Sequence, residues 1–557
     1  MTEADRTADN ALGRLLILVL AAALCVLILD RTPIANGFSV LPGDRYDGVI
    51  ASVILEHWYS VFTGQTPWTE VGYFYPYTHT LAQTDSHLIN GLLYIPFRAT
   101  GLDPFLSAHL SKLPLRLFGF FAFYALCRKY KVSFGWAAVA AALFTLSNAV
   151  TSHGSRLQLA SIAVAPFMAI LVWNTLAGII NQNSRAVLMW GSAAGFTFGL
   201  WCMTTFYMAW SFFYLFLVWG AVLVIWAGRD RLLVFWFATC KVWPALVAVV
   251  VVAAASIAPF AYIYLPKAAE TGIRSFDDAW MFTVLPVEII QVGVQNILFG
   301  DITQAIIKRI NPAYVATGEY SNTGPNIALA FLLLAAVISA IYADRSSWRS
   351  LGFAALALAT VITWATTIRI GHTSLWLLVY HTIPGAKALR VVSIHQMFLI
   401  GPMLFLVAAY LSRQAIPAVI AILVAGVLLL GELNQEYINL HRNDELQRLA
   451  EIPAPPASCE AFYVTGWNEQ ANADHIGNLY AHNVSAMAIS QVLDLPTING
   501  FASFNPPDWD FGSPGAADYE SRVAEYAKDH RIADSLCRLD LDEKSWSALE
   551  LNRLNAR

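Results

Sequence analysis

Charged side chains are scarce in this sequence. Asp, Glu, Lys and Arg make up 13% of the 557 residues, hydrophobic residues make up 57%, and the mean hydropathy is +0.54. Soluble globular proteins carry about 25% charged residues, so the composition excludes that class. The formal net charge of −4 is small and gives no basis for a nucleic-acid partner. The composition indicates an integral membrane protein.

The sequence also lacks the short motifs of common soluble enzymes. It has no Walker loop, no HExxH or GxSxG motif and no GxGxxG fingerprint of a dinucleotide-binding fold. Its six cysteines include no CxxC pair and no Cys/His spacing typical of a zinc site. We therefore assign no metal ligands and no required cofactor, although loop carboxylates described below could hold a divalent cation.

Long apolar runs are abundant. A run of about 20 residues suffices to cross roughly 30 Å of hydrocarbon. The fold class predicted from these runs is mainly α, a polytopic membrane protein with about eleven transmembrane helices. They lie near residues 12–29, 105–127, 134–151, 158–180, 186–204, 208–227, 242–264, 326–343, 351–369, 395–412 and 415–432.

Basic residues in the short loops predict the orientation. If the N-terminus is cytoplasmic, the Lys and Arg residues of loops 128–131, 185, 229–231, 344–349 and 413 all fall on the cytoplasmic side. No small-residue cleavage site precedes Asp30, so we expect the first helix to be a signal anchor. Residues 31–104, 265–325, 370–394 and 433–557 are then predicted to lie outside.

These boundaries divide the chain into a transmembrane domain, 1–432, and a small C-terminal extracytoplasmic α/β domain, 433–557. Two large outer loops, 31–104 and 265–325, belong to the first domain. Apolar residues at helical spacing predict interfacial helices at 45–63, 85–98 and 287–310. In the C-terminal domain we expect a strand at 462–464, a strand followed by a loop at 497–509, and a helix at 519–531.

Two cysteines, Cys459 and Cys537, flank the C-terminal domain, whereas the other four lie in or beside apolar helices. Disulfides form and persist in oxidising compartments. If the domain lies outside the cytoplasm, Cys459 and Cys537 are a candidate disulfide pair.

The first outer loop is several times longer than a turn requires, and its aromatic content argues against disorder. It contains three candidate catalytic residues, Asp44, Asp47 and Asp85. Asp44 and Asp47 could cap and charge the start of a helix, or one of them could be a general base. Asp85 could bind a substrate, orient the base, hold a metal or cap the helix that it opens.

Basic residues at the outer ends of spans are candidates for binding a phosphate. His109, Lys112 and Arg116 share one face of the second span, where ionisable groups are costly and often functional. The alternative is that their side chains reach to the interface. Lys387 and Arg390 precede the tenth span, where Arg390 could contact a phosphate through two bonds or anchor the membrane edge.

Other polar and aromatic residues are candidates for binding a substrate. His153 and Arg156 lie on a short turn that is predicted to be outside. The positive-inside pattern predicts no basic residues on such a turn. Tyr75 belongs to an aromatic turn, which suits either an interfacial belt or a surface for stacking sugar rings. The full set of substrate-binding candidates is Glu56, His57, Tyr75, His87, His109, Arg156 and His372.

Several motifs resemble the polytopic GT-C glycosyltransferases, and more narrowly a set of bacterial membrane proteins in that superfamily. The motifs are GDRYDG at 43–48, LEH at 55–57, FYP at 74–76, TD at 84–85, PGAKALR at 384–390, PTING at 496–500 and NPPDW at 505–509. The layout is similar over nearly the whole chain, with a long acidic first outer loop, a second large outer loop and an outer C-terminal domain.

The resemblance implies a glycosyltransferase of the bacterial inner (cytoplasmic) membrane, with its active site and C-terminus in the periplasm. Such an enzyme transfers a sugar from a polyprenyl-phosphate donor to a glycan, lipid or protein acceptor. Asp44 or Asp47 would be the base, although the family's adjacent acidic pair is replaced here by two aspartates three residues apart. No predicted cytoplasmic segment is long enough for a nucleotide-binding domain, which agrees with a donor that arrives through the membrane.

A direct displacement would invert the anomeric configuration, and Arg390 with Lys112 or Arg116 would stabilise the leaving phosphate. Two other classes stay open. A lipid or polysaccharide transporter or flippase is expected to have an internal repeat and midplane charges, and Arg116 is the one feature that favours it. In a non-catalytic envelope scaffold, the first-loop aspartates would be replaceable.

Overall fold

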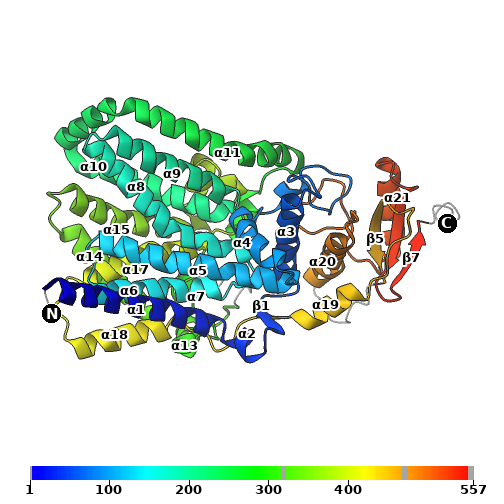
Figure 1. Cartoon of the computed structure of the whole chain (residues 1–557), viewed down its shortest axis with the longest axis horizontal. Helices are drawn as coiled ribbons and strands as arrows, with labels where there is room; N and C mark the ends of the chain where they lie inside the picture. The colour runs from blue at the N-terminus through cyan, green and yellow to red at the C-terminus, as the bar shows by residue number, and fades with distance from the viewer. Residues whose placement is uncertain (1–2, 316–321, 467–474, 550–557) are drawn as a thin grey trace.

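Long apolar helices form most of the protein. The computed structural model describes residues 3–315, 322–466 and 475–549, and these are mainly helical, as predicted. Parts of the predicted second outer loop (316–321) and of the predicted C-terminal domain (467–474 and 550–557) lie outside the described residues. Figure 1 shows a helical bundle with the N-terminus at its far end and the C-terminal region at the opposite end.

Within the described residues, eight helical segments are long and apolar enough to cross a membrane. The helices that form them are α1 (Glu3–Leu29), α5 (Pro104–Lys129), α6 (Phe134–Leu146) with α7 (Asn148–Thr151), the 3₁₀ helix η2 (Leu157–Val164) with α8 (Ala165–Ile180), α10 (Phe206–Lys241), α11 (Trp243–Thr271), α15 (Trp348–Thr367) and α17 (Ser393–Leu411). These segments identify a membrane protein.

The other three predicted spans also contain helices. They are α9 (Ser184–Cys202), α14 (Ile327–Tyr342) and α18 (Ala418–Leu430). The last two are shorter than the other candidate spans, so the total of eleven spans stays a prediction.

The centre and the edge of the bundle differ in how their helices pack. Nearly every residue of α17 is buried, because α6, α10, α14 and α15 surround it. Helix α11 lies at the edge and packs on α9 through Gly191, Gly195 and Gly199, which are spaced four residues apart. Glycines at this spacing let two helix backbones approach closely in a membrane.

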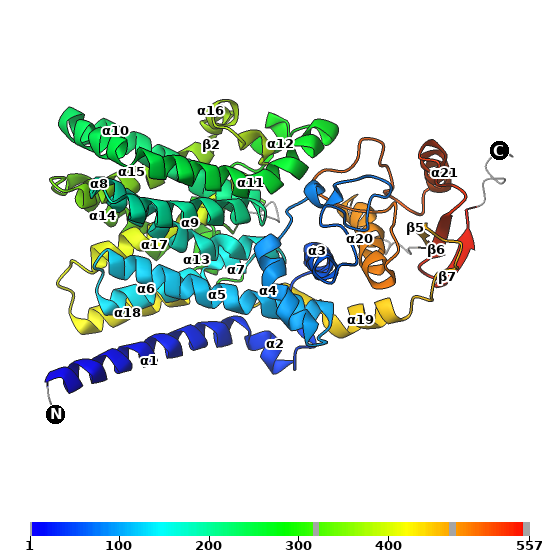
Figure 2. The same cartoon turned by 45° about the horizontal axis from the view of Figure 1, so that its top comes forward.

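The first outer loop folds into short elements at one end of the bundle. They are α2 (Arg31–Ala35), β1 (Val40–Pro42), α3 (Asp47–Phe62), the 3₁₀ helix η1 (Thr80–Gln83) and α4 (Leu88–Ala99). Figures 1 and 2 show α3 across the direction of the bundle helices, between the bundle and α20 (His475–Leu493).

The prediction of an amphipathic α3 differs from the structure. Residues around the whole helix are buried, because α4 and α5 cover one side and α20 covers another. Val49, Val53 and Trp58 join Val484 and Met487 of α20 in one hydrophobic cluster. Because side chains on several sides of the helix are buried, α3 is an internal element of the fold rather than a surface one.

The other segments that were predicted to lie outside contain short elements. They comprise α12 (Phe276–Met281), the 3₁₀ helix η3 (Pro286–Ile290), α13 (Gly300–Ile310), the hairpin of β2 (Arg369–Ile370) and β3 (Thr373–Ser374), α16 (Trp376–Thr382) and the 3₁₀ helix η4 (Ala386–Ala388). The predicted helix at 287–310 is therefore shorter than expected and amounts to α13. Its Ile302, Ile306 and Ile310 form an exposed stripe on one side, as an interfacial helix would.

The C-terminal region contains a small sheet. Its elements are β4 (Asn439–His441), α19 (Arg442–Ala450), β5 (Ala461–Thr465), α20, α21 (Tyr519–Asp529), β6 (Leu536–Asp540) and β7 (Ser545–Ala548). The sheet order is β5-β6-β7, with β5 and β6 parallel and β6 and β7 antiparallel. The strand at 462–464 and the helix at 519–531 are confirmed as β5 and α21.

The predicted strand at 497–501 is wrong as a strand, since only an isolated bridge joins Phe462 and Thr497. The segment instead lies between β5 and the first outer loop and forms backbone hydrogen bonds with both. Ile498 donates its N–H to Phe462 of β5, while Thr497 donates to Gly72 and accepts from Tyr75 of the first outer loop. The PTING motif therefore joins the first outer loop to the C-terminal sheet.

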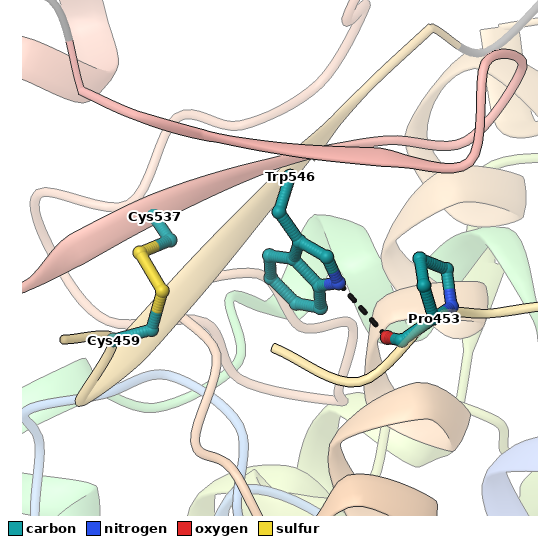
Figure 3. The surroundings of a disulfide bond; sticks show 4 residues. All are labelled: Pro453, Cys459, Cys537 and Trp546. Atoms are coloured by element: carbon teal, nitrogen blue, oxygen red, sulfur yellow. Dashed lines mark hydrogen bonds between the residues drawn. A yellow bond between two sulfur atoms is a disulfide. The ribbon is translucent and has the colours of Figure 1, made fainter. Parts of the chain in front are cut away.

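The predicted disulfide between Cys459 and Cys537 is present (Figure 3). It links the residues before β5 to β6, and the nearby Trp546 of β7 donates its indole N–H to Pro453 O at 2.9 Å. All four remaining cysteines were expected to be buried as small apolar side chains. Cys25, Cys127 and Cys202 are buried, but the expectation is wrong for Cys240, which is exposed.

Candidate active site

Two predicted catalytic residues, Asp47 and Asp85, meet the same short segment of the bundle. Asp47 Oδ2 lies 3.0 Å from Arg156 Nε. Asp85 accepts a hydrogen bond from the side chain of Gln158. Arg156 and Gln158 lie at the start of η2, two residues apart. Two carboxylates that are 38 residues apart in sequence thus both contact the start of η2.

Asp44 has a capping role. Its Oδ1 accepts hydrogen bonds from the backbone N–H groups of Tyr46 and Gly48, both at 3.0 Å. The amides at the start of a helix have no partner within the helix, and a side-chain oxygen of this kind satisfies them. Asp44 was predicted either to cap the helix or to be a general base. The structure shows the capping contacts, which hold the start of α3 in place.

Asp85 lies where the first outer loop meets the start of α10. Its two oxygens accept from Thr205 Oγ1 at 3.0 Å and from Phe206 N at 3.2 Å. Burial raises the pKa of Asp85 to about 6, although its three hydrogen bonds oppose that shift. Asp85 therefore caps α10 rather than α4, the helix that it was predicted to open.

A cationic cavity of about 80 Å³ lies between α1, α5, α6 and η2, and Asp47 contacts Arg156 in its wall. Four nitrogen-bearing side chains line it: Lys112, Arg116, His153 and Arg156. No carboxylate is among the described residues that line this cavity. Guanidinium and ammonium groups gathered in this way are suited to an anion such as a phosphate.

Two of the cavity cations are held in place by protein groups. Lys112 is buried and donates to Gly154 O at 2.9 Å and to Pro42 O at 3.4 Å. Arg116 Nη1 donates to Asp30 Oδ1 at 2.7 Å. His109 Nε2 lies 3.6 Å from the same Asp30 oxygen. The predicted basic face of α5 therefore packs against the end of α1, and Asp30 offsets part of its charge.

Lys387 and Arg390 do not line this cavity. The backbone N–H of Arg390 donates to Tyr207 Oη at 3.0 Å, and its guanidinium lies 5.0 Å from the centre of the Phe282 ring. Lys387 is exposed beside the Tyr380 ring. The four cations predicted to hold one phosphate therefore fall into two groups, Lys112 with Arg116 and Lys387 with Arg390.

Arg274 joins the second group. Burial and then the nearby Arg390 lower the pKa of Arg274. Its guanidinium donates to Ser503 O and lies over the Phe504 ring. Tyr207, which contacts Arg390, directly follows Phe206, which contacts Asp85. The first turn of α10 therefore lies between Asp85 and this group of cations.

Two predicted substrate-binding residues, Glu56 and His57, make internal contacts in α3. The Glu56 carboxylate pairs with Arg98 at 2.9 Å and accepts from Tyr94 Oη, which joins α3 to α4. His57 is buried against Trp68 O at 3.1 Å. Burial lowers the pKa of His57 to about 4, so its ring is neutral at pH 7.

The other three predicted substrate-binding residues, His87, Tyr75 and His372, lie in different places. His87 is buried at the start of α4, and burial lowers its pKa to about 3. Tyr75 packs against the C-terminal region, where Tyr526 Oη donates to Tyr75 O at 2.9 Å. His372 is exposed in the turn of the β2–β3 hairpin.

Four residues that contact or lie near the predicted site residues were not themselves predicted: Asp30, Gln158, Thr205 and Arg274. Asp30 lies in an apolar stretch that ends at the membrane edge, where an acidic residue is a usable signal. Gln158 and Thr205 carry no charge, and nothing local in the sequence distinguishes them. Arg274 has a basic side chain in the second outer loop, but its neighbours come from residues 390 and 503–504.

Residues that could ligate a metal are not grouped. In the part of the chain that the structure describes, no three His, Cys, Asp or Glu side chains lie close enough together to hold an ion. Compared with models of known protein families and with curated proteins, the sequence matches none of them.

Proposed function

We propose that the protein is a GT-C-type glycosyltransferase that uses a polyprenyl-phosphate-linked sugar. The observation that carries this proposal is the cationic cavity of Lys112, Arg116, His153 and Arg156, with the Asp47 carboxylate 3.0 Å from one of its cations. The cavity takes the donor phosphate at the outer end of the bundle. Asp47 lies beside it, where an acceptor hydroxyl reaches the anomeric carbon.

In the proposed reaction, Asp47 is the general base. It takes the proton of the acceptor hydroxyl while that oxygen forms a bond to the anomeric carbon. The bond from that carbon to the phosphate oxygen breaks, and polyprenyl phosphate leaves from the opposite face, so the configuration inverts. The cavity cations stabilise the negative charge of the leaving phosphate, a contribution of about 3–4 kcal/mol for one well-placed donor.

Asp47 is a better base than Asp44 because Asp44 Oδ1 already accepts two backbone hydrogen bonds. Asp85 is the supporting carboxylate, since it ties the first outer loop to α10 and η2. The side-chain exposed fraction of Asp47 is 31%, which leaves room for an acceptor to approach.

The proposed location is the bacterial inner membrane, with eleven spans, a cytoplasmic N-terminus and a periplasmic active site. The Cys459–Cys537 disulfide supports a periplasmic C-terminal region, because disulfides persist in oxidising compartments. The partners are a lipid-linked donor, a glycan, lipid or protein acceptor, and membrane lipids. Arg116 no longer favours a transporter, since it pairs with Asp30 at the end of α1 rather than at a midplane.

The test is a turnover assay on the full chain in nanodiscs. A panel of polyprenyl-phosphate hexoses and pentoses is offered together with an envelope glycan fraction as acceptor, and the transfer of sugar from lipid to glycan is measured. We expect Asp47→Asn to lower turnover by about 10²–10⁴-fold. Asp44→Asn is the matched control, because Asn caps helices as well as Asp does, and we expect it to retain most of the turnover. Full turnover in Asp47→Asn would exclude Asp47 as the base.

A further inference from the structure

A second cavity, of about 410 Å³, lies outside the helical bundle. Its walls are α19, α20 and the turn that joins β6 to β7, and Arg45 and Val49 at the start of α3 close the side nearest the candidate active site. Figures 1 and 2 show α19 and α20 between α3 and the C-terminal sheet. Small-molecule sites in proteins enclose about 300–1,000 Å³, so this cavity is large enough for one.

One wall of the cavity is apolar. Val484, Ala488 and Ile489 of α20 contribute to it together with Leu541, and Val484, Ala488 and Ile489 are themselves buried. A wall of this kind covers the C–H face of a ring or chain and excludes water from it.

The rim of the cavity carries charges of both signs that are paired with one another. Arg45 Nε lies 3.0 Å from Glu445, and Arg448 lies 3.4 Å from the same carboxylate. Lys544 pairs with Glu451 across the opposite side. Four carboxylates and three cations line the cavity in total, so it has no excess of positive charge. This cavity therefore differs from the phosphate-sized cavity at Lys112 and is not suited to an anion.

Paired carboxylates and guanidinium groups above an apolar wall match the chemistry of a neutral saccharide. Carboxylate oxygens accept from sugar hydroxyls, guanidinium and amide groups donate to them, and the apolar wall covers the C–H face of the ring. We propose that this cavity binds the neutral saccharide portion of the acceptor. The acceptor role rests on the proposed glycosyltransferase function, whereas saccharide binding does not.

Arg45 links this cavity to the candidate active site. It lies between Asp44 and Asp47 in the chain and donates to Ser485 Oγ of α20 at 3.0 Å. A saccharide held against Arg45 extends its next units toward the start of α3. Binding a remote part of a substrate in this way positions the reacting hydroxyl and lowers the entropy cost of the reaction.

The experiment measures binding to the full chain in nanodiscs by isothermal titration. The protein carries Asp47→Asn and no donor is added, so that no transfer occurs. The probes are neutral gluco-, manno- and galacto-oligosaccharides of two to four units, with inorganic phosphate and an oligouronate as anionic comparisons. Ala488→Phe fills the cavity, and Val492→Phe on the exposed side of the same helix is the matched control.

We expect at least one neutral oligosaccharide to bind, Ala488→Phe to weaken that binding at least about tenfold, and Val492→Phe to leave it unchanged within about twofold. Gln447→Ala at the exposed rim gives a second test if Ala488→Phe disturbs α20. Failure of all neutral probes, preference for the anions, or unchanged binding in both cavity variants would overturn the proposal. Because no donor is used, these results are separate from the turnover of lipid-linked sugar.

Discussion

Asp47 and Asp85 show how one loop can supply two carboxylates with different surroundings. Asp47 is partly exposed and lies against Arg156, whereas the Asp85 carboxylate is enclosed and accepts hydrogen bonds from Thr205 and Phe206. Enzymes commonly assign different roles to paired carboxylates through such differences in environment. This contrast is the reason why we assign the proton transfer to Asp47 and the positioning of the loop to Asp85.

The raised pKa of Asp85 predicts a pH dependence of stability. Its pKa is about 6 in the folded protein and about 3.9 in an unfolded chain, so the folded state binds the proton more tightly. The free energy of unfolding should therefore fall as the pH rises from 4 to 6, by about 2 kcal/mol. Asp85→Asn should lack this fall. Melting temperatures in detergent across this range test it, and identical pH profiles for both proteins would contradict it.

Local sequence signals located the charged residues of the site but not their partners. Asp44, Asp47, Asp85 and Lys112 stand out because charge is rare in this chain. Their partners Gln158 and Thr205 are ordinary polar residues from distant segments, and only the folded chain brings them together. For the same reason the sequence grouped Arg390 with Lys112, although the structure separates them.

The packing of α9 on α11 predicts a strong effect of a small substitution. A Cβ on Gly199 would lie 2.5 Å from the backbone carbon of Ser256, so the two helices would have to separate. We expect Gly199→Ala to destabilise the protein by about 1–3 kcal/mol. Gly220→Ala on α10 is the control, because a Cβ there meets nothing within 4 Å. Equal melting temperatures for the two variants would contradict this account of the helix contact.

At the scale of elements, hydrophobic periodicity was sufficient to locate helices but not to say what covers them. Each of the eleven apolar runs contains a helix. Helix α3 was also located, yet its burial depends on α20, which lies more than 400 residues further along the chain. The segment 497–501 reads as a strand locally, but its backbone bonds go to β5 on one side and the first outer loop on the other.

At the scale of the whole molecule, the C-terminal region covers the loop that carries the carboxylates. β4 pairs with β1 just before Asp44, Arg442 pairs with Asp103, and Arg45 pairs with Glu445 of α19. These contacts predict that the C-terminal region and the first outer loop lie on the same side of the membrane, opposite the N-terminus.

Site-directed labelling tests this orientation. In a Cys240→Ser background, Glu525→Cys places an exposed thiol on α21, and Asp230→Cys places one within α10, two residues after its kink at Gly228. A membrane-impermeant maleimide should label Glu525→Cys in intact spheroplasts and label Asp230→Cys only after permeabilisation. The reverse pattern would contradict the proposed topology and place the carboxylates in the cytoplasm.

The proposed function requires that the cavity at Lys112 hold the phosphate of a polyprenyl phosphate. The most direct test is the affinity of the full chain in nanodiscs for polyprenyl phosphate, compared between Lys112→Met and Lys129→Met, which changes the opposite end of the same helix. We predict that Lys112→Met weakens binding by about 10–100-fold, the value of a charge-assisted hydrogen bond, and that Lys129→Met does not. Equal affinity in the wild-type protein and Lys112→Met would contradict the account.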